Sequence, residues 1–216
     1  RRNMLQLPFS TEWGASIAHY GAMDALPLYQ DIEIKNEVTS FQTATAYFNV
    51  GKSLASMGAV AAEQGYSVLV SGYTYLAGGK FFPSLDIAGN VGWLLPVGQH
   101  NSFWLKTCAG QSFGDSGSVF GNSYFGGFRN NYVDNGEVNR YRSLNSMPGA
   151  RIDQIKAHNY AKFTGEINFC PIRFNNFGAL QFYPNYIQFN LFANDLMTDW
   201  WGSGRAGRAT VSSQSK

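Results

Sequence analysis

The side chains that most often carry chemistry are sparse in this sequence and are not grouped. His19, His100 and His158 stand far apart, and no H-x-x-x-H, H-E-x-x-H or C-x-x-C spacing occurs. Residues 114–118, GDSGS, match the short sequence around a serine-protease nucleophile, but no recognisable His and Asp partners surround them. The sequence therefore predicts no enzyme, no metal site and no cofactor.

The two cysteines, Cys108 and Cys170, are too few for a disulfide framework or a four-cysteine metal site. Two unpaired thiols are the favoured interpretation. A single bridge in an oxidising compartment stays open, because sequence alone fixes no Cα–Cα distance.

The composition favours β structure and excludes some partners. Of the 216 residues, 16% are aromatic, only 14% are charged and 24 are glycine. Aromatic side chains favour strands, and the scarcity of charge fits a surface that faces something other than water. No apolar run reaches the about 18 residues that a spanning helix needs. A net charge of +2, with no basic cluster among aromatics, predicts no nucleic-acid partner.

Strands must therefore position any functional side chains, and the clearest one lies at 81–97. Nearly every odd position there is apolar, whereas the even positions include Ser84, Asp86 and Asn90. A period of two places these sets on opposite faces of one extended strand. This strand is far longer than the about 5–6 residues usual in globular sheets. After a short turn at 98–101, a second strand completes a hairpin.

The other segments extend the same pattern. Alternating strands are expected within 41–52, 66–79, 158–171 and 179–201, and short connections without helical crossovers require antiparallel pairing. We expect an uncertain N-terminal strand or loop segment over 1–40, barrel strands over 41–201 and a polar tail or loop over 202–216. Residues 112–157 lose the alternation and are rich in Gly, Asn, Ser and Tyr, which predicts one long loop.

Alternation alone does not separate a soluble β fold from a membrane barrel, but strand length and aromatic position do. A tilted spanning strand needs about 9–11 residues, and the expected strands are at least that long. Tryptophans near the expected strand ends fit an aromatic girdle at the two membrane interfaces. They are Trp93, Trp104, Trp200 and Trp201. The predicted fold is all-β, an antiparallel transmembrane β-barrel, or an incomplete part of one, with a long lid-like loop.

The stretch from about residue 45 to residue 193, above all residues 65–110 and 125–183, resembles the barrel of the bacterial surface antigen superfamily, which contains outer-membrane protein insertases and two-partner secretion transporters. Gly-Tyr opens a long strand, a Leu-Pro turn follows, and "FGGFRNNYVDNGEVNRYR" resembles the long lid loop of that family. The family's Val-Arg-Gly-Phe or Val-Arg-Gly-Tyr motif corresponds to "NRYR", which lacks the glycine, and "GEINFCP" corresponds to the strand that follows. The family barrel has more strands than this chain supplies, so the resemblance implies an incomplete barrel.

The resemblance also implies a contact between the lid and the lumen. In the family the lid loop folds into the lumen and its Arg meets acidic groups on the wall. Here the corresponding residues are Arg140 or Arg142, with Glu166 on the polar strand face. A planar guanidinium matches a carboxylate and can hold a mobile loop. The alternative is a solvated "NRYR" loop, with Glu166 paired to neighbouring Lys162 or to no protein group.

The expected function is that of a non-enzymatic barrel in the bacterial outer membrane that inserts or translocates polypeptides or anchors a periplasmic module. Its partners would be the lipid bilayer and unfolded outer-membrane polypeptides, or periplasmic or outer-membrane subunits. Two alternatives stay open: a passive outer-membrane channel or transporter barrel, and a soluble all-β adhesin or lectin-like binding module.

Overall fold

The computed structural model describes residues 4–6, 9–21, 38–56, 59–98, 100–127, 142–174, 186–200 and 207–214. Within these ranges the chain is almost entirely antiparallel β-sheet without an α-helix, and Val119–Gly121 forms the short 3₁₀ turn η2. No helix in these ranges has the length and apolar character needed to cross a membrane. The prediction of an all-β, antiparallel fold is confirmed.

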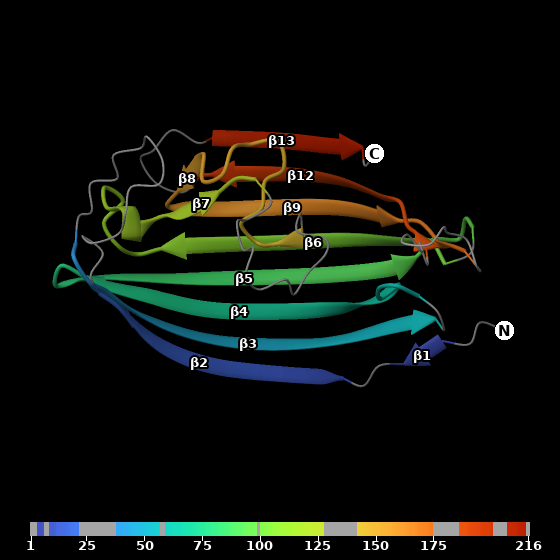
Figure 1. Cartoon of the computed structure of the whole chain (residues 1–216), viewed down its shortest axis with the longest axis horizontal. Helices are drawn as coiled ribbons and strands as arrows, with labels where there is room; N and C mark the ends of the chain where they lie inside the picture. The colour runs from blue at the N-terminus through green and yellow to red at the C-terminus, as the bar shows by residue number, and fades with distance from the viewer. Residues whose placement is uncertain are drawn as a thin grey trace, which may run out of the picture.

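One large sheet contains most of the described chain (Figure 1). Its strands are β1 (Met4–Gln6), β2 (Ser10–Tyr20), β3 (Phe41–Ser56), β4 (Gln64–Ala77), β5 (Lys80–Leu94), β6 (Ser102–Ser112), β9 (Asn159–Asn168), β12 (Asn190–Thr198) and β13 (Gly207–Gln214). They lie in the order β1-β3-β4-β5-β6-β9-β12-β13, and β2 pairs with β3 beside β1. Two small pairs stand apart: β7 (Ser123–Phe125) with β8 (Ile155–Ala157), and β10 (Ile172–Arg173) with β11 (Tyr186–Ile187).

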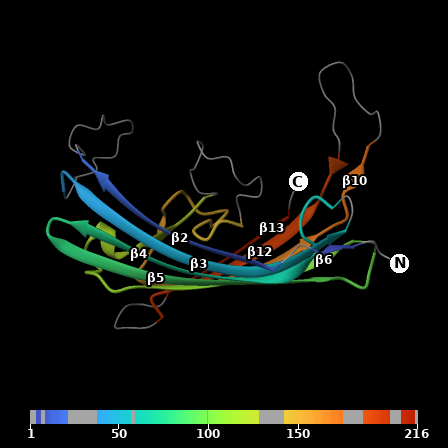
Figure 2. The ribbon, with the colours of Figure 1, turned by 90° about the horizontal axis from the view of Figure 1, so that it is seen from below.

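The large sheet is not closed into a barrel among the described strands. On one side β1 and β2 pair only with β3, and on the other side β13 pairs only with β12. Figure 2 shows the sheet curved into a trough. The sheet therefore confirms the antiparallel strands of the prediction without the closure that would remove its two edges.

Local sequence explains the tightest connection of the sheet. Gly78 and Gly79, with φ values of 56° and 74°, join β4 to β5, and Ala77 pairs directly with Lys80. A two-residue turn with both φ values positive matches the twist of the strands and favours glycine at both positions. The expected hairpin follows as β5 and β6, connected through 95–101.

The C-terminal end of the chain differs from the sequence expectation. The sequence predicts a polar tail or loop over 202–216, yet Gly207–Gln214 forms β13 along β12. A strand edge offers a full row of backbone donors and acceptors, so it can recruit a segment that has no apolar alternation. At the other end, Ser10–Tyr20 forms β2, and much of the remaining N-terminal segment lies outside the described residues.

The convex outer face of the sheet is apolar and exposed. Cross-strand partners such as Val70 and Ile87 share this face, and their exposed fractions are 36% and 49%. The same register places many more exposed apolar side chains on it: Trp13, Ile17, Phe48, Tyr66, Val68, Leu76, Phe81, Leu85, Val91, Trp93, Leu105, Phe163 and Leu191. A continuous apolar face of this extent marks an interaction surface rather than scattered surface side chains.

The concave inner face is polar, and much of it is buried. The polar side chains of this face that are under 9% exposed are Ser84, Asp86, Ser102, Ser112, Lys162, Thr164, Glu166, Asn168, Asn194 and Thr198. Residues 113–127 and 142–157, the described parts of the predicted long loop, lie over the concave side of the sheet (Figure 2), and we call them the covering segment. The usual distribution of a soluble sheet, with its apolar face buried, is therefore reversed.

Candidate functional site

The inner face carries the charged pair that the family resemblance implied. Glu166 on β9 is fully buried, and Arg142 of the covering segment reaches it from above. Arg142 Nε donates to both carboxylate oxygens at 3.1 Å, and Nη2 donates to Oε1. The planar guanidinium therefore binds the carboxylate through hydrogen bonds from two of its nitrogens. Arg140, the other candidate, lies outside the described residues.

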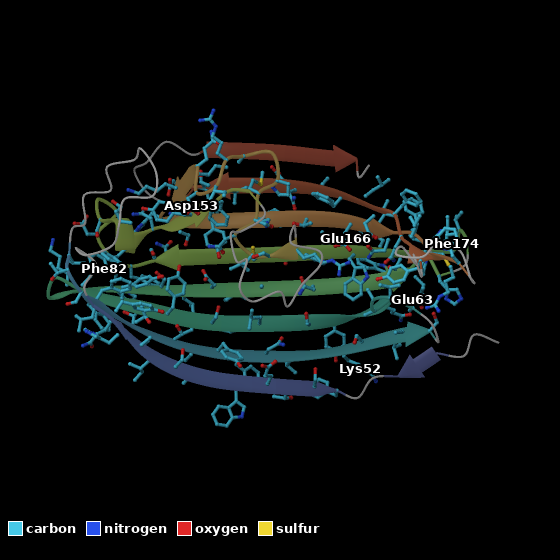
Figure 3. All side chains as sticks on the ribbon, viewed as in Figure 1. Lys52, Glu63, Phe82, Asp153, Glu166 and Phe174 are labelled. Carbon is cyan, nitrogen blue, oxygen red and sulfur yellow. The ribbon has the colours of Figure 1, made fainter. Side chains whose placement is uncertain are left out.

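A second cation completes this ion cluster. Lys106 on β6 donates from Nζ to Oε2 of Glu166 at 2.7 Å, and its side chain is 18% exposed. Lys106 pairs with Thr164, so it is a diagonal cross-strand neighbour of Glu166 on the same face. One buried carboxylate thus joins β6, β9 and the covering segment. Figure 3 places Glu166 toward the end of the sheet where Glu63 lies, away from Asp153.

Lys162 contacts the covering segment in another way. Its Nζ donates to the backbone oxygens of Ser143, Leu144 and Ser146 at 3.0, 3.1 and 2.6 Å. The ammonium is buried and faces carbonyl dipoles in place of a carboxylate, so it satisfies three acceptors of one turn at once. The alternative pairing of Glu166 with Lys162 is therefore not found among the described ion pairs.

Apolar packing supports these polar contacts. The rings of Phe125 and Tyr160 lie 4.6 Å apart at 67°, an edge-to-face arrangement. Both belong to a small core with Met147, Ala157 and Leu196. Because Phe125, Met147 and Ala157 come from the covering segment, this core sits between that segment and the sheet. The covering segment is packed, hydrogen-bonded and ion-paired to β9 and its neighbours.

The predicted tryptophans do not lie on one face. Trp93 is on the outer face, 47% exposed, with its ring against Phe103. Trp104 pairs with Gly92 and therefore lies on the inner face, where its indole covers the glycine. Trp200 follows β12 and is 56% exposed, and Trp201 lies outside the described residues.

A third polar cluster, formed by Ser56, Glu63 and His100, lies at the Glu63 end of the sheet. Buried Glu63 accepts hydrogen bonds from Ser56 N and Ser56 Oγ at 3.1 and 2.8 Å. His100 Nδ1 lies 3.0 Å from Ser56 Oγ and 3.1 Å from Glu63 Oε1. A nucleophilic triad needs the two ring nitrogens to face different partners. In this cluster the Nδ1 atom of His100 contacts both Ser56 and Glu63. The contacts therefore hold these three residues together but do not have the arrangement of a nucleophilic triad.

The GDSGS stretch forms a local turn. Asp115 Oδ1 accepts from Gly117 N at 2.9 Å, and Ser118 Oγ accepts from Phe120 N at the start of η2. His158 has a structural contact, because its Nδ1 lies 2.9 Å from the carbonyl oxygen of Gly121. These contacts are those of caps and turns.

Metal-ligating groups and thiols add little to the site. Over the described ranges, no three His, Cys, Asp or Glu side chains come together in a group that could hold a metal ion. Cys108 and Cys170 are both free thiols.

Sequence reasoning missed Lys106 and the use made of Lys162. A signal for both existed: each is even-numbered on a strand whose odd positions face outward, so each shares the face of Glu166. The strand order was the missing information, because β6 and β9 are neighbours in space across a long intervening segment.

Comparison with family models, curated proteins and solved structures gives no match to this chain.

Proposed function

We propose that this chain forms part of the wall of a bacterial outer-membrane β-barrel that passes or inserts polypeptide, with the covering segment acting as a lid over its polar lumen. The observation that carries the proposal is the reversed burial of the sheet. The apolar outer face is exposed and the polar inner face is covered. A membrane barrel needs this distribution, since lipid meets one face and a hydrated lumen meets the other.

The ion cluster supports the lid. A segment held by Arg142, Lys162 and a small apolar core blocks the inner face, yet charged contacts of this kind can be exchanged for water when a substrate enters. The resemblance to the surface antigen superfamily points in the same direction.

Trp93 and Trp104 offer a matched test of the membrane face. They lie on adjacent strands at the same level, because Trp104 pairs with Gly92, but on opposite faces. Single-tryptophan variants retaining one or the other are reconstituted into vesicles with brominated lipids. Quenching of Trp93 fluorescence and protection of Trp104 are expected. Equal quenching of both, or a monomer that stays soluble without detergent and ignores vesicles, would contradict the proposal.

The lid is tested by conductance in planar bilayers. Wild-type protein is expected to be mostly closed, and Arg142→Gln to open more often, because the guanidinium grip on Glu166 is lost. Conductance that is the same for both proteins would favour a passive pore. A protein that inserts but conducts nothing in either form would favour a structural anchor.

A further inference from the structure

A cavity on the inner face lies away from the ion cluster, between the sheet and the covering segment. Its volume is about 810 Å³. Ligand pockets are commonly about 300–1,000 Å³. β2, β3, β4 and β5 supply one wall, and residues around Ser123, Asn145 and Asp153 of the covering segment supply the other.

Aromatic rings form the sheet wall of this cavity. Tyr20 and Phe41 stack with centroids 4.8 Å apart and planes at 19°. Phe41 and Tyr75 meet at 6.2 Å, and Tyr75 and Tyr73 at 5.8 Å. All four rings line the cavity, so they form one continuous aromatic surface across three strands. The opposite wall is fixed to it by a hydrogen bond between Tyr73 Oη and Ser123 Oγ at 3.2 Å.

Two carboxylates face the same cavity from opposite walls. Asp86 belongs to β5 and lies diagonal to Tyr73, while Asp153 belongs to the covering segment. Among the described residues that line the cavity there is no lysine, arginine or histidine. The charged groups of this described lining are therefore acidic, in contrast to the cationic surroundings of Glu166.

Asp86 is the unusual member of this lining. It is only 7% exposed, and within the described part of the chain no cation forms an ion pair with it. Its carboxylate receives a hydrogen bond from the neutral hydroxyl of Tyr160 at 2.9 Å. A carboxylate buried this far is costly unless a positive charge compensates it. Glu166, which is fully buried, has two cations beside it.

We propose that this cavity binds an organic cation of the alkylammonium class, held by Asp86 against the aromatic surface of Tyr20, Phe41, Tyr73 and Tyr75. Faces of Tyr and Phe attract cations most when the cation is desolvated, and aromatic side chains recognise quaternary ammonium groups. Asp86 supplies the opposite charge, since no described side chain forms an ion pair with it. Because the ligand touches both walls, its binding stabilises the covered state of the inner face.

The test measures binding of choline to the purified chain by titration calorimetry, with 3,3-dimethylbutan-1-ol, its uncharged carbon isostere, as the matched ligand. Choline is expected to bind saturably and the isostere about tenfold more weakly. Asp86→Asn and Phe41→Leu are each expected to weaken choline binding about tenfold. Equal affinity for choline and the isostere, or the absence of saturable choline binding, would overturn the proposal.

Two control variants separate the charge of Asp86 from its structural contact. Tyr160→Phe removes the hydrogen bond to Asp86 but keeps the carboxylate, so choline affinity is expected to be retained or increased. Glu12→Gln removes an exposed carboxylate outside the cavity and is expected to leave affinity unchanged. If Asp86→Asn folds normally by circular dichroism and binds choline as the wild type does, Asp86 is not the cation ligand. Lipid exposure of Trp93 is measured separately, so failure here leaves the barrel proposal intact.

Discussion

The hydroxyl of Tyr160 on β9 donates to Oδ1 of Asp86 on β5 at 2.9 Å, although β6 runs between these two strands. The contact passes over Gly110, which pairs with Asp86 on one side and with Tyr160 on the other. A Cβ at Gly110 would fall within 2.7 Å of Cζ of Tyr160 and would also collide with the carboxylate. The glycine therefore keeps open the path of a hydrogen bond that links three strands.

Substituting Gly110 by alanine is expected to destabilise the sheet. The methyl group must displace either a buried ring or a buried carboxylate, and overpacking of this kind typically costs about 1–3 kcal/mol. Urea unfolding followed by circular dichroism measures the free energy of unfolding. Gly72→Ala is the matched control, because a Cβ there meets only the Ser84 carbonyl oxygen at 3.9 Å. An equal loss of stability in both variants would show that the cost comes from the strand backbone and not from the Tyr160–Asp86 contact.

The two faces of the sheet are the part of this structure that the sequence predicts best. Alternation along 81–97 separates Ile87 and Val91 from Ser84 and Asp86, and the structure has the first pair exposed and the second pair buried. Period two assigns side chains to faces, but it carries no information on which face is covered. Which face is covered depends on the covering segment. Its Gly- and Asn-rich sequence has no hydrophobic period from which its position could be predicted.

Pairing across distant segments is what sequence reasoning could not supply. The family resemblance implied the contact between Arg142 and Glu166. The contact between Lys106 and Glu166 depends on the pairing of β6 with β9, which the sequence alone does not reveal. For Trp104, the location predicted from the sequence differs from the face on which the structure places it. Its position near a strand end fitted an interfacial girdle, but its even number places it on the inner face over Gly92. Residue parity within each strand was the stronger indicator in both cases.

Neutralising Glu166 is expected to cost more than removing Lys106. Glu166→Gln leaves Arg142 and Lys106 facing a neutral amide, so two poorly solvated cations lose their counter-charge. Breaking a buried ion pair in this way costs about 3–5 kcal/mol. Lys106→Met keeps the Arg142–Glu166 pair, and a cost of about 1–2 kcal/mol is expected.

The comparison uses urea unfolding of both variants with Glu12→Gln as the control. Glu12 is exposed, so its substitution is expected to stay within about 0.5 kcal/mol of wild type. A Glu166→Gln protein as stable as the Lys106→Met protein would mean that water or another group already compensates the two cations.

Removing the ammonium of Lys162 is expected to loosen the covering segment while the sheet persists. Lys162→Met removes one donor from each of three carbonyl oxygens of the 143–146 turn, of which Ser143 O still accepts from Ser146 N and Oγ. A buried acceptor left unpaired costs about 1–3 kcal/mol unless the turn moves to water. The turn is therefore expected to leave the wall. Limited proteolysis should cut within 142–157 faster than in the wild type, with the β signal in circular dichroism unchanged. Lys80→Met, an exposed lysine beside the Gly78–Gly79 turn, is expected to be cut at the wild-type rate. Unchanged proteolysis of Lys162→Met would show that Arg142 and the apolar core hold the segment without the lysine.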